Sequence, residues 1–213
     1  MTKTLLTLLA AITVIMSPSI AQATEPVGDA PAAVTAEIGK PAPAFTATDS
    51  NGKTHNLSDF AGKTVVLEWT SHECPYVRKH YDSGNMQGLQ KDATDKGIIW
   101  LTVVSSAPDK QGYTDADEAN RVIDREKSAE TARLLDPTGA LGKLYGASTT
   151  PHMFVIDGAG TLVYAGAIDD KPSVSASSLE GAQNYVKDAL ADLAAGTAVK
   201  VASSKPYGCG VKY

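Results

Sequence analysis

Apolar runs alternate with charged, amphipathic stretches along most of this chain. Two runs are almost continuously apolar, TVVLEWT at 64–70 and IIWLTVVSS at 98–106, and this is typical of strands buried on both faces of a parallel sheet. The segment from 75 to about 93 has a helical pattern, with an interruption expected near Gly84. The two strands and the helix that joins them predict the centre of a parallel sheet.

Weaker patterns complete the chain in the same alternating order. AFTATDSNGKTHNL predicts an extra N-terminal hairpin around the turn at 49–52, and SLEGAQNYVKDALADLAAG predicts an amphipathic helix at 178–196. The other expected elements are a helical turn at 57–63, a charged helix at 115–130, a strand at 132–137, a short helix at 140–146, and a hairpin with strands at 152–157 and 161–168. This order predicts an α/β fold, with a mixed central sheet and helices on both faces.

The N-terminus has the pattern of a secretory signal peptide. Lys3 gives a positive start, LLTLLAAITVIM at 5–16 is an apolar core too short for a comfortable membrane span, and AQA at 21–23 offers small residues for cleavage. An uncleaved amphipathic anchor is the alternative. We therefore expect a periplasmic or secreted protein that is not held at a membrane once the signal peptide is removed.

The composition of the rest of the chain favours a single domain with short extensions. Its length suffices for one well-buried core, and no internal repeat is present. The expected segments are a signal peptide at 1–23, a disordered lead-in at 24–37, one domain at 38–196 and a C-terminal tail at 197–213.

Charge and motif content exclude several classes of function. The formal net charge is −5, and no basic cluster occurs, so we expect no nucleic-acid partner. The sequence contains no Gly-rich phosphate loop, Gly-x-Ser-x-Gly or His-Glu-x-x-His motif, so nothing supports a serine hydrolase or zinc protease. We expect no cofactor. Only two cysteines occur, Cys74 and Cys209, and an even count in an exported protein is typical of disulfide formation.

Cys74 lies where a strand passes into a helix. Pro75 suits the first helical position because its missing N–H would have no partner there. Cys74 then caps the helix, where unpaired backbone N–H groups and the positive end of the helix dipole lower a thiol pKa. Arg78 and Lys79 add positive charge one turn further on. These features favour a reactive thiolate, and the alternative is a buried, inert cysteine.

Two hydroxyl side chains accompany Cys74 at the end of the same strand. Thr70 and Ser71 come directly after the apolar run, so they are candidate donors to the sulfur or to a substrate. We predict that both support the active site.

The chain from about 38 to 196 resembles the redoxin group of the thioredoxin-like superfamily. This group includes the alkyl hydroperoxide reductase/thiol-specific antioxidant family and its peroxiredoxin-like relatives. The resemblance rests on IGKPAPAF, DSNGK with LSDFAGK, TVVLEWT running into Cys74-Pro75, TTPHMFVID and GTLVYAGAID. It implies a thioredoxin-like fold, and it implies that Pro151 is a cis-proline facing the reactive sulfur.

The chain departs from both branches of that group. Val77 stands where a disulfide-exchanging member has its second cysteine, and Leu67 stands where a peroxiredoxin has a proline. Ser71 fills the Thr/Ser place of the peroxiredoxin motif, but no arginine lies near Pro151. The resemblance therefore implies an antioxidant, peroxiredoxin-like thiol oxidoreductase, with Cys74 attacking a peroxide or a disulfide and a thiol reductant as partner.

Cys209 is the only cysteine that could resolve Cys74. It lies between Gly208 and Gly210, so its backbone is free to adapt, and the resemblance permits a C-terminal resolving cysteine. We expect the reduced protein to hold the two thiols apart on a mobile tail that docks on oxidation. The alternative is a tail thiol that pairs with small thiols or with nothing.

Histidines near Cys74 suggest two rival classes. His72, His80 and His152 could join Cys74 in a copper or zinc site, which would make the protein a copper-handling binding protein. Against this, Cys74 and His80 are not spaced for one helix face. A non-catalytic interaction domain is the other rival. His55, in the early hairpin, is interpreted as a surface residue.

Overall fold

A seven-stranded mixed sheet forms the centre of the computed structural model, which describes residues 1–2 and 35–213. The expected signal peptide and most of the expected lead-in lie outside the described residues, so they stay predictions. No helix within the described residues is both long and apolar enough to cross a membrane.

The sheet has the mixed topology that the sequence predicts. β3, β4 and β5 run parallel, and the remaining neighbours pair antiparallel. β1 and β2 form the expected N-terminal hairpin. Across the sheet the order is β2 (Thr54–Asn56), β1 (Thr46–Asp49), β5 (Ala132–Leu135), β4 (Ile99–Val104), β3 (Val65–Trp69), β7 (His152–Ile156) and β8 (Leu162–Gly166).

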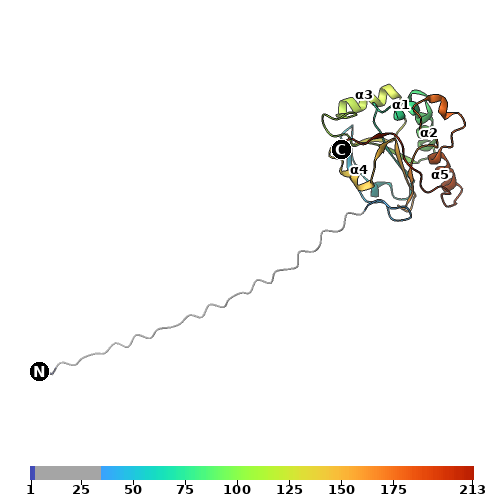
Figure 1. Cartoon of the computed structure of the whole chain (residues 1–213). Coiled ribbons are helices and arrows are strands. Elements are labelled where there is room, and N and C mark those ends of the chain that lie inside the picture. The colour runs from blue at the N-terminus through green and yellow to red at the C-terminus, as the bar shows by residue number, and fades with distance from the viewer. Residues whose placement is uncertain (3–34) are drawn as a thin grey trace. The chain divides into compact units, whose positions relative to one another are not determined.

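Helices cover both faces of this sheet (Figure 1). Alternate residues of β3 point to opposite faces, so Val66 packs with α1, α2 and α5, whereas Leu67 packs with α4. The helices are α1 (Pro75–Asp82), α2 (Asn85–Thr94), α3 (Ala116–Glu126), α4 (Ala140–Tyr145) and α5 (Tyr185–Ala194), with 3-10 turns η1 (Leu57–Phe60) and η2 (Ala176–Leu179).

Two helices are shorter than the sequence pattern predicts. α3 ends at Glu126 because Lys127 adopts a left-handed conformation with φ of 50°, so the expectation of helix to residue 130 is wrong. α5 begins only at Tyr185, where Asn184 caps the helix by accepting from the Lys187 N–H. Residues 178–184 are therefore outside the helix that was expected there. The expected break at Gly84 is confirmed, with φ of 77°.

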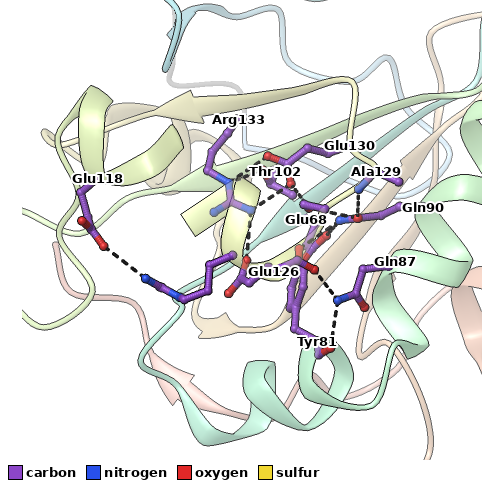
Figure 2. Close-up of polar contacts among 12 residues, drawn as sticks. Glu68, Tyr81, Gln87, Gln90, Thr102, Glu118, Glu126, Ala129, Glu130 and Arg133 are labelled. Carbon is purple, nitrogen blue, oxygen red and sulfur yellow. Dashed lines mark hydrogen bonds and ion pairs between the residues drawn. The ribbon is translucent and has the colours of Figure 1, made fainter. Parts of the chain in front are cut away.

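A carboxylate is buried in the middle of β3. Glu68 accepts hydrogen bonds from Trp100 Nε1 at 2.8 Å, Tyr81 Oη at 2.9 Å and Gln90 Nε2 at 3.2 Å (Figure 2). Its complete burial outweighs these donors and raises its pKa to about 7. The strand that leads to Cys74 is thus tied to both α1 and α2 through one side chain.

The polar network continues from α2 to α3 and β5 (Figure 2). Ser128 donates to Gln90 Oε1 at 3.1 Å and to Glu130 Oε2 at 2.6 Å. Arg133, which is buried, pairs with Glu130 at 2.8 Å and with Glu126 at 3.4 Å. Buried charges need such partners to be tolerated, and these contacts hold the loop after α3 against the sheet.

Candidate active site

Cys74 stands at the carboxyl end of β3 as the N-cap of α1, with Pro75 at the first helical position. This confirms the predicted placement. The cysteine is only 1% exposed, and its thiol donates to the Thr150 carbonyl oxygen at 3.0 Å. Cys74 therefore lies at the carboxyl edge of the central strand, as expected for a site in this type of sheet.

The pKa of the Cys74 thiol is lowered and that of the Cys209 thiol is raised. Burial raises the pKa of Cys74, but hydrogen bonds from the side chains of Cys209 and Thr150 and from backbone N–H groups outweigh burial and lower it. Burial and donation to the Cys74 sulfur raise the pKa of Cys209 to about 11. Cys74 is therefore the more acidic thiol of the pair, and Cys209 is the one that keeps its proton to higher pH.

The segment before β7 faces the Cys74 sulfur, as the resemblance implies. The Thr150–Pro151 peptide bond is cis, which confirms the prediction for Pro151. Thr149–Thr150 form the two-residue strand β6, and the Thr150 carbonyl is the acceptor of the Cys74 thiol. Pro151 fixes the path of the backbone that presents this carbonyl.

The C-terminal tail is docked although both cysteines are free. Cys209 and Gly210 form β9, which pairs antiparallel with β6 so that Cys209 lies opposite Thr150. The expectation that the reduced protein holds the thiols apart on a mobile tail is therefore wrong. Gly208 explains the difference: at φ of +137°, a Cβ there would lie 1.9 Å from the Thr150 oxygen. The glycine permits close backbone contact rather than freedom of movement.

A buried polar cluster holds the tail just before Cys209. Tyr207 donates to Asp169 Oδ1 at 2.5 Å, and Lys79 Nζ donates to Tyr207 Oη at 3.1 Å. Lys79 also pairs with Asp169 Oδ2 at 3.5 Å, and both side chains are almost fully buried. His80 lies within 3.8 Å of the same carboxylate, and burial lowers its pKa to about 4. The neutral histidine leaves Lys79 as the cation that balances Asp169.

The last residue of the tail, Tyr213, packs closely against two glycines at the start of α4. A Cβ on Gly139 would lie 2.2 Å from the Tyr213 ring, and a Cβ on Gly142 would lie 2.4 Å from the Tyr213 hydroxyl oxygen. Tyr213 also donates to the Ala147 carbonyl at 2.6 Å. The tail is thus fixed on both sides of Cys209.

A small cavity of about 10 Å³ adjoins the Cys74 sulfur, which is the space of about one water molecule. Thr70 and Ser71 are buried in its wall, and their role in supporting the active site stays a prediction. Its remaining lining comes from the opposite loops and from the tail: Ser105, Ser106, Gln111, Thr150, Cys209, Gly210, Val211 and Lys212.

Other candidate side chains lie elsewhere. Arg78 is in solvent, where it pairs with Asp82 at 3.4 Å, and it is not among the groups that lower the Cys74 pKa. Lys79 turns away into the Asp169 cluster. The expected contribution of these two cations to the thiolate is therefore wrong, because the hydrogen bonds around the sulfur supply it instead.

The histidines do not assemble a metal site with Cys74. Within residues 1–2 and 35–213, no group of three or more His, Cys, Asp or Glu side chains could hold a metal ion. His152 is buried, lies 4.4 Å from the Phe154 ring centre, and has its pKa lowered to about 4 by burial. His55 is also buried and contacts Asp49 at 2.7 Å, so its interpretation as a surface residue is wrong.

Sequence reasoning missed three residues of this site: Thr150, Asp169 and Tyr207. Thr150 contributes its backbone carbonyl, and every residue type has one, so the sequence does not mark this role. Asp169 follows β8 and is one of many acids. Tyr207 lies in the run PYGCG, and an aromatic residue beside a glycine-flanked cysteine was the one available signal of an anchored tail.

Comparison with known proteins identifies the family of this chain. The Redoxin family model matches residues 37–182. The chain belongs to the Redoxin family. It is 29% identical over 130 residues to the thiol-disulfide oxidoreductase ResA from Bacillus thuringiensis subsp. konkukian, covering 60% of this chain and 68% of that one.

Solved structures confirm the thioredoxin-like fold. A hypothetical protein from Sinorhizobium meliloti 1021 superposes with a TM-score of 0.70 at 20% identity, covering 83% of this chain and 94% of that one. A putative thiol:disulfide interchange protein DsbE from Chlorobium tepidum gives a TM-score of 0.50 at 24% identity, with coverage of 61% and 84%. Together with the family match, the relatives support a thiol oxidoreductase.

Proposed function

We propose that this redoxin is an exported thiol–disulfide oxidoreductase in which Cys74 is the nucleophile and Cys209 is the resolving thiol. The observation that carries the proposal is the placement of both cysteines at one small cavity, where Cys209 pairs opposite Thr150 and the Thr150 carbonyl oxygen lies 3.0 Å from the Cys74 sulfur. In this arrangement the pKa of Cys74 is lowered and that of Cys209 is raised. A thiolate beside a protonated thiol is the arrangement that dithiol exchange needs.

The exchange of the substrate disulfide with the two protein thiols proceeds in two steps. The Cys74 thiolate attacks one sulfur of a substrate disulfide, forms a mixed disulfide with it and releases the other sulfur as a thiolate, which takes up a proton. Cys209 then loses its proton and attacks the Cys74 sulfur, which releases the second substrate thiol and leaves a Cys74–Cys209 disulfide. Two electrons pass from the protein dithiol to the substrate. An external thiol reductant returns the protein to its starting state by the reverse exchange.

A small peroxide is the second candidate substrate. The water-sized cavity beside Cys74 and its hydroxyl lining from Thr70 and Ser71 favour it. In this reaction the thiolate attacks one peroxide oxygen, the other oxygen leaves with a proton as water or an alcohol, and Cys74 becomes a sulfenic acid. Cys209 then attacks this sulfenic acid, expelling water and forming the same intramolecular disulfide.

Thiol counting with two oxidants tests the proposal. The reduced protein is mixed with one equivalent of a disulfide-bonded protein such as insulin or with one equivalent of hydrogen peroxide, and remaining thiols are titrated. We expect wild type to lose both thiols together and Cys209→Ser to accumulate a mixed disulfide or sulfenic acid at Cys74. Cys74→Ser should react with neither oxidant. A Cys74→Ser variant that reacts as fast as wild type would disprove the assignment of the nucleophile.

Export and the segment boundaries belong to the same proposal. We infer that the signal peptide at 1–23 is removed and that the domain at 38–196 works with the tail at 197–213 in the periplasm or outside the cell. N-terminal sequencing of the protein recovered from the producing cell tests this inference. A protein that retains residues 1–23 and stays inside the inner membrane would contradict it.

A further inference from the structure

We propose that the docked tail is a size gate over Cys74, with the Tyr207 hydroxyl as its latch. While the tail is docked, only molecules of about the size of water or peroxide reach the sulfur, and a protein disulfide reaches it after the tail leaves. This inference rests on the proposed role of Cys74 as nucleophile and adds a rule for which substrates it meets.

Burial of the sulfur is the first observation. Cys74 is 1% exposed, and the adjoining cavity of about 10 Å³ has room for about one water molecule. Four of its lining residues, 209–212, belong to the tail. A disulfide on a folded protein brings its own backbone to within a few ångströms of the attacked sulfur, and no such space exists here. Removal of this wall opens the site.

The second observation is the set of contacts that the Tyr207 side chain makes. The Tyr207 hydroxyl joins Asp169, which accepts from it, to Lys79, which donates to it. The Lys79 ammonium also lies 5.2 Å from the centre of the Tyr207 ring, and Tyr76 packs edge-on against the same ring at 5.8 Å. Loss of the hydroxyl removes a charge-assisted hydrogen bond from the tail while leaving the aromatic packing in place.

Because of its position, the Tyr207 hydroxyl holds the part of the tail that covers Cys74. Tyr207 lies two residues before Cys209, on the same extended segment that pairs with β6. Beyond Cys209 the segment is held by backbone bonds, from Val211 N to Ser148 O at 3.1 Å and from Ala107 N to Lys212 O at 2.8 Å. Weakening the latch therefore favours release of the part of the tail that covers Cys74.

Neighbouring Lys205 provides a matched control. It is exposed, belongs to the same tail, and has no hydrogen bond or ion pair among the contacts that hold the tail. Its replacement by alanine removes a charge from the tail without touching the latch. Tyr207→Phe and Lys205→Ala are therefore compared in a Cys209→Ser background, which isolates the first step at Cys74.

The test measures the rate at which Cys74 loses its thiol to hydrogen peroxide and to a disulfide-bonded protein, insulin. The ratio of the two rates cancels any shared change in the Cys74 pKa. Loss of a hydrogen bond to a charged group shifts the docking equilibrium by about tenfold or more. We expect Tyr207→Phe to raise the insulin-to-peroxide ratio by about tenfold, and Lys205→Ala to leave it unchanged. Hydrogen exchange at 205–212 checks that the tail of Tyr207→Phe is released and the remaining fold is intact.

The outcomes separate the gate from the proposed function. An unchanged ratio in Tyr207→Phe with a released tail would overturn the gate while Cys74 still reacts. If the tail of Tyr207→Phe stays docked, the role of Tyr207 as the latch is overturned. Gly208→Ala then serves as the variant that releases the tail by steric overlap. An unchanged ratio of the two rates in Gly208→Ala would also overturn the gate. If Cys74 reacts with neither oxidant in any variant, the proposed function fails and the gate fails with it.

Discussion

At the scale of single residues, the contact between two thiols assigns each a different role. Burial raises the pKa of both thiols, and the interaction between them lowers that of Cys74, together with other hydrogen bonds, and raises that of Cys209 further. The sequence predicted activation by the helix N-terminus together with the cations Arg78 and Lys79, and the backbone N–H of Val77 does contribute. In the structure those cations pair with carboxylates, so the acidity of Cys74 depends on neutral hydrogen-bond donors close to the sulfur.

The Cys74 pKa should therefore respond to Cys209 and not to Arg78. Cys209→Ala and Cys209→Ser each leave one thiol, whose ionisation is followed by ultraviolet thiolate absorbance against pH. We expect the serine variant, which keeps a hydroxyl donor, to titrate below the free-thiol value of about 8.5, and the alanine variant to titrate higher. Arg78→Ala in the serine background should leave the midpoint unchanged. A midpoint that rises with loss of Arg78 and not with loss of the hydroxyl would contradict this explanation.

Glu68 predicts a specific dependence of stability on pH. Its pKa is raised by burial from 4.5 to about 7, so the folded state binds this proton more tightly than the unfolded state. The stabilisation from the protonated form is complete below pH 4.5, falls as pH rises, and is lost above about 7. The full difference is about 3 kcal/mol on the linkage relation.

Glu68→Gln tests this by removing the titration. Urea unfolding at a series of pH values should show a free energy of unfolding that falls in wild type relative to the variant between pH 4.5 and 7. The difference between the two proteins cancels the effect of other titrating groups, including His80 and His152. Parallel curves for wild type and variant across that window would show that Glu68 is ionised throughout.

At the scale of elements, the sequence predicted the central sheet better than the ends of the helices. β3 and β4 were predictable because continuous apolar runs have few alternatives in a protein of this size. The end of α3 was not predictable, since it depends on a left-handed lysine at 127 and on polar contacts of the next loop with Gln90. Tertiary contacts of this kind are not visible in a local pattern.

The tail shows the same limit more strongly. Cys74 and Pro75 could be located from the passage of an apolar strand into a helix, and Pro151 could be located from the resemblance of TTPHMFVID to the redoxin group. The pairing of β6 with β9 could not, because each strand has only two residues and the pairing is across a long sequence separation. Glycine beside Cys209 was interpreted as freedom, whereas it provides space for close packing at Gly208.

Gly208 and Gly210 offer a paired test of tail docking. Alanine at 208 would place a Cβ 1.9 Å from the Thr150 oxygen, whereas alanine at 210 would meet only Ser148 O at 3.9 Å. We expect Gly208→Ala to remove protection of the Val211 amide from hydrogen exchange and Gly210→Ala to preserve it. Equal protection in both variants would show that the close approach at Gly208 does not control docking.

At the scale of the whole molecule, docking of the tail in the reduced state links the C-terminus to the stability of the fold. Because both cysteines line one small cavity while the tail is docked, oxidation needs little movement of the backbone. A Cys74–Cys209 disulfide then closes a loop of roughly 135 residues, and the chain-entropy model gives up to about 5 kcal/mol of stabilisation.

Oxidation should therefore stabilise the protein through Cys209. We expect the free energy of unfolding in urea to be higher for oxidised than for reduced wild type, by a few kcal/mol. Cys209→Ser treated with the same oxidant should show no such increase. A lower stability of oxidised wild type would mean that the native geometry does not accommodate the bond.

The most direct test of the account is a map of the disulfide formed by the protein itself. Reduced wild type at low concentration is treated with one equivalent of oxidant, its remaining thiols are blocked, and its peptides are identified by mass spectrometry under non-reducing conditions. The account predicts one linked pair, Cys74 with Cys209 within a single chain. This disulfide should form so quickly that no mixed disulfide accumulates. Accumulation of oxidised Cys74 with Cys209 still free, at the same rate in wild type and in Cys209→Ser, would contradict it.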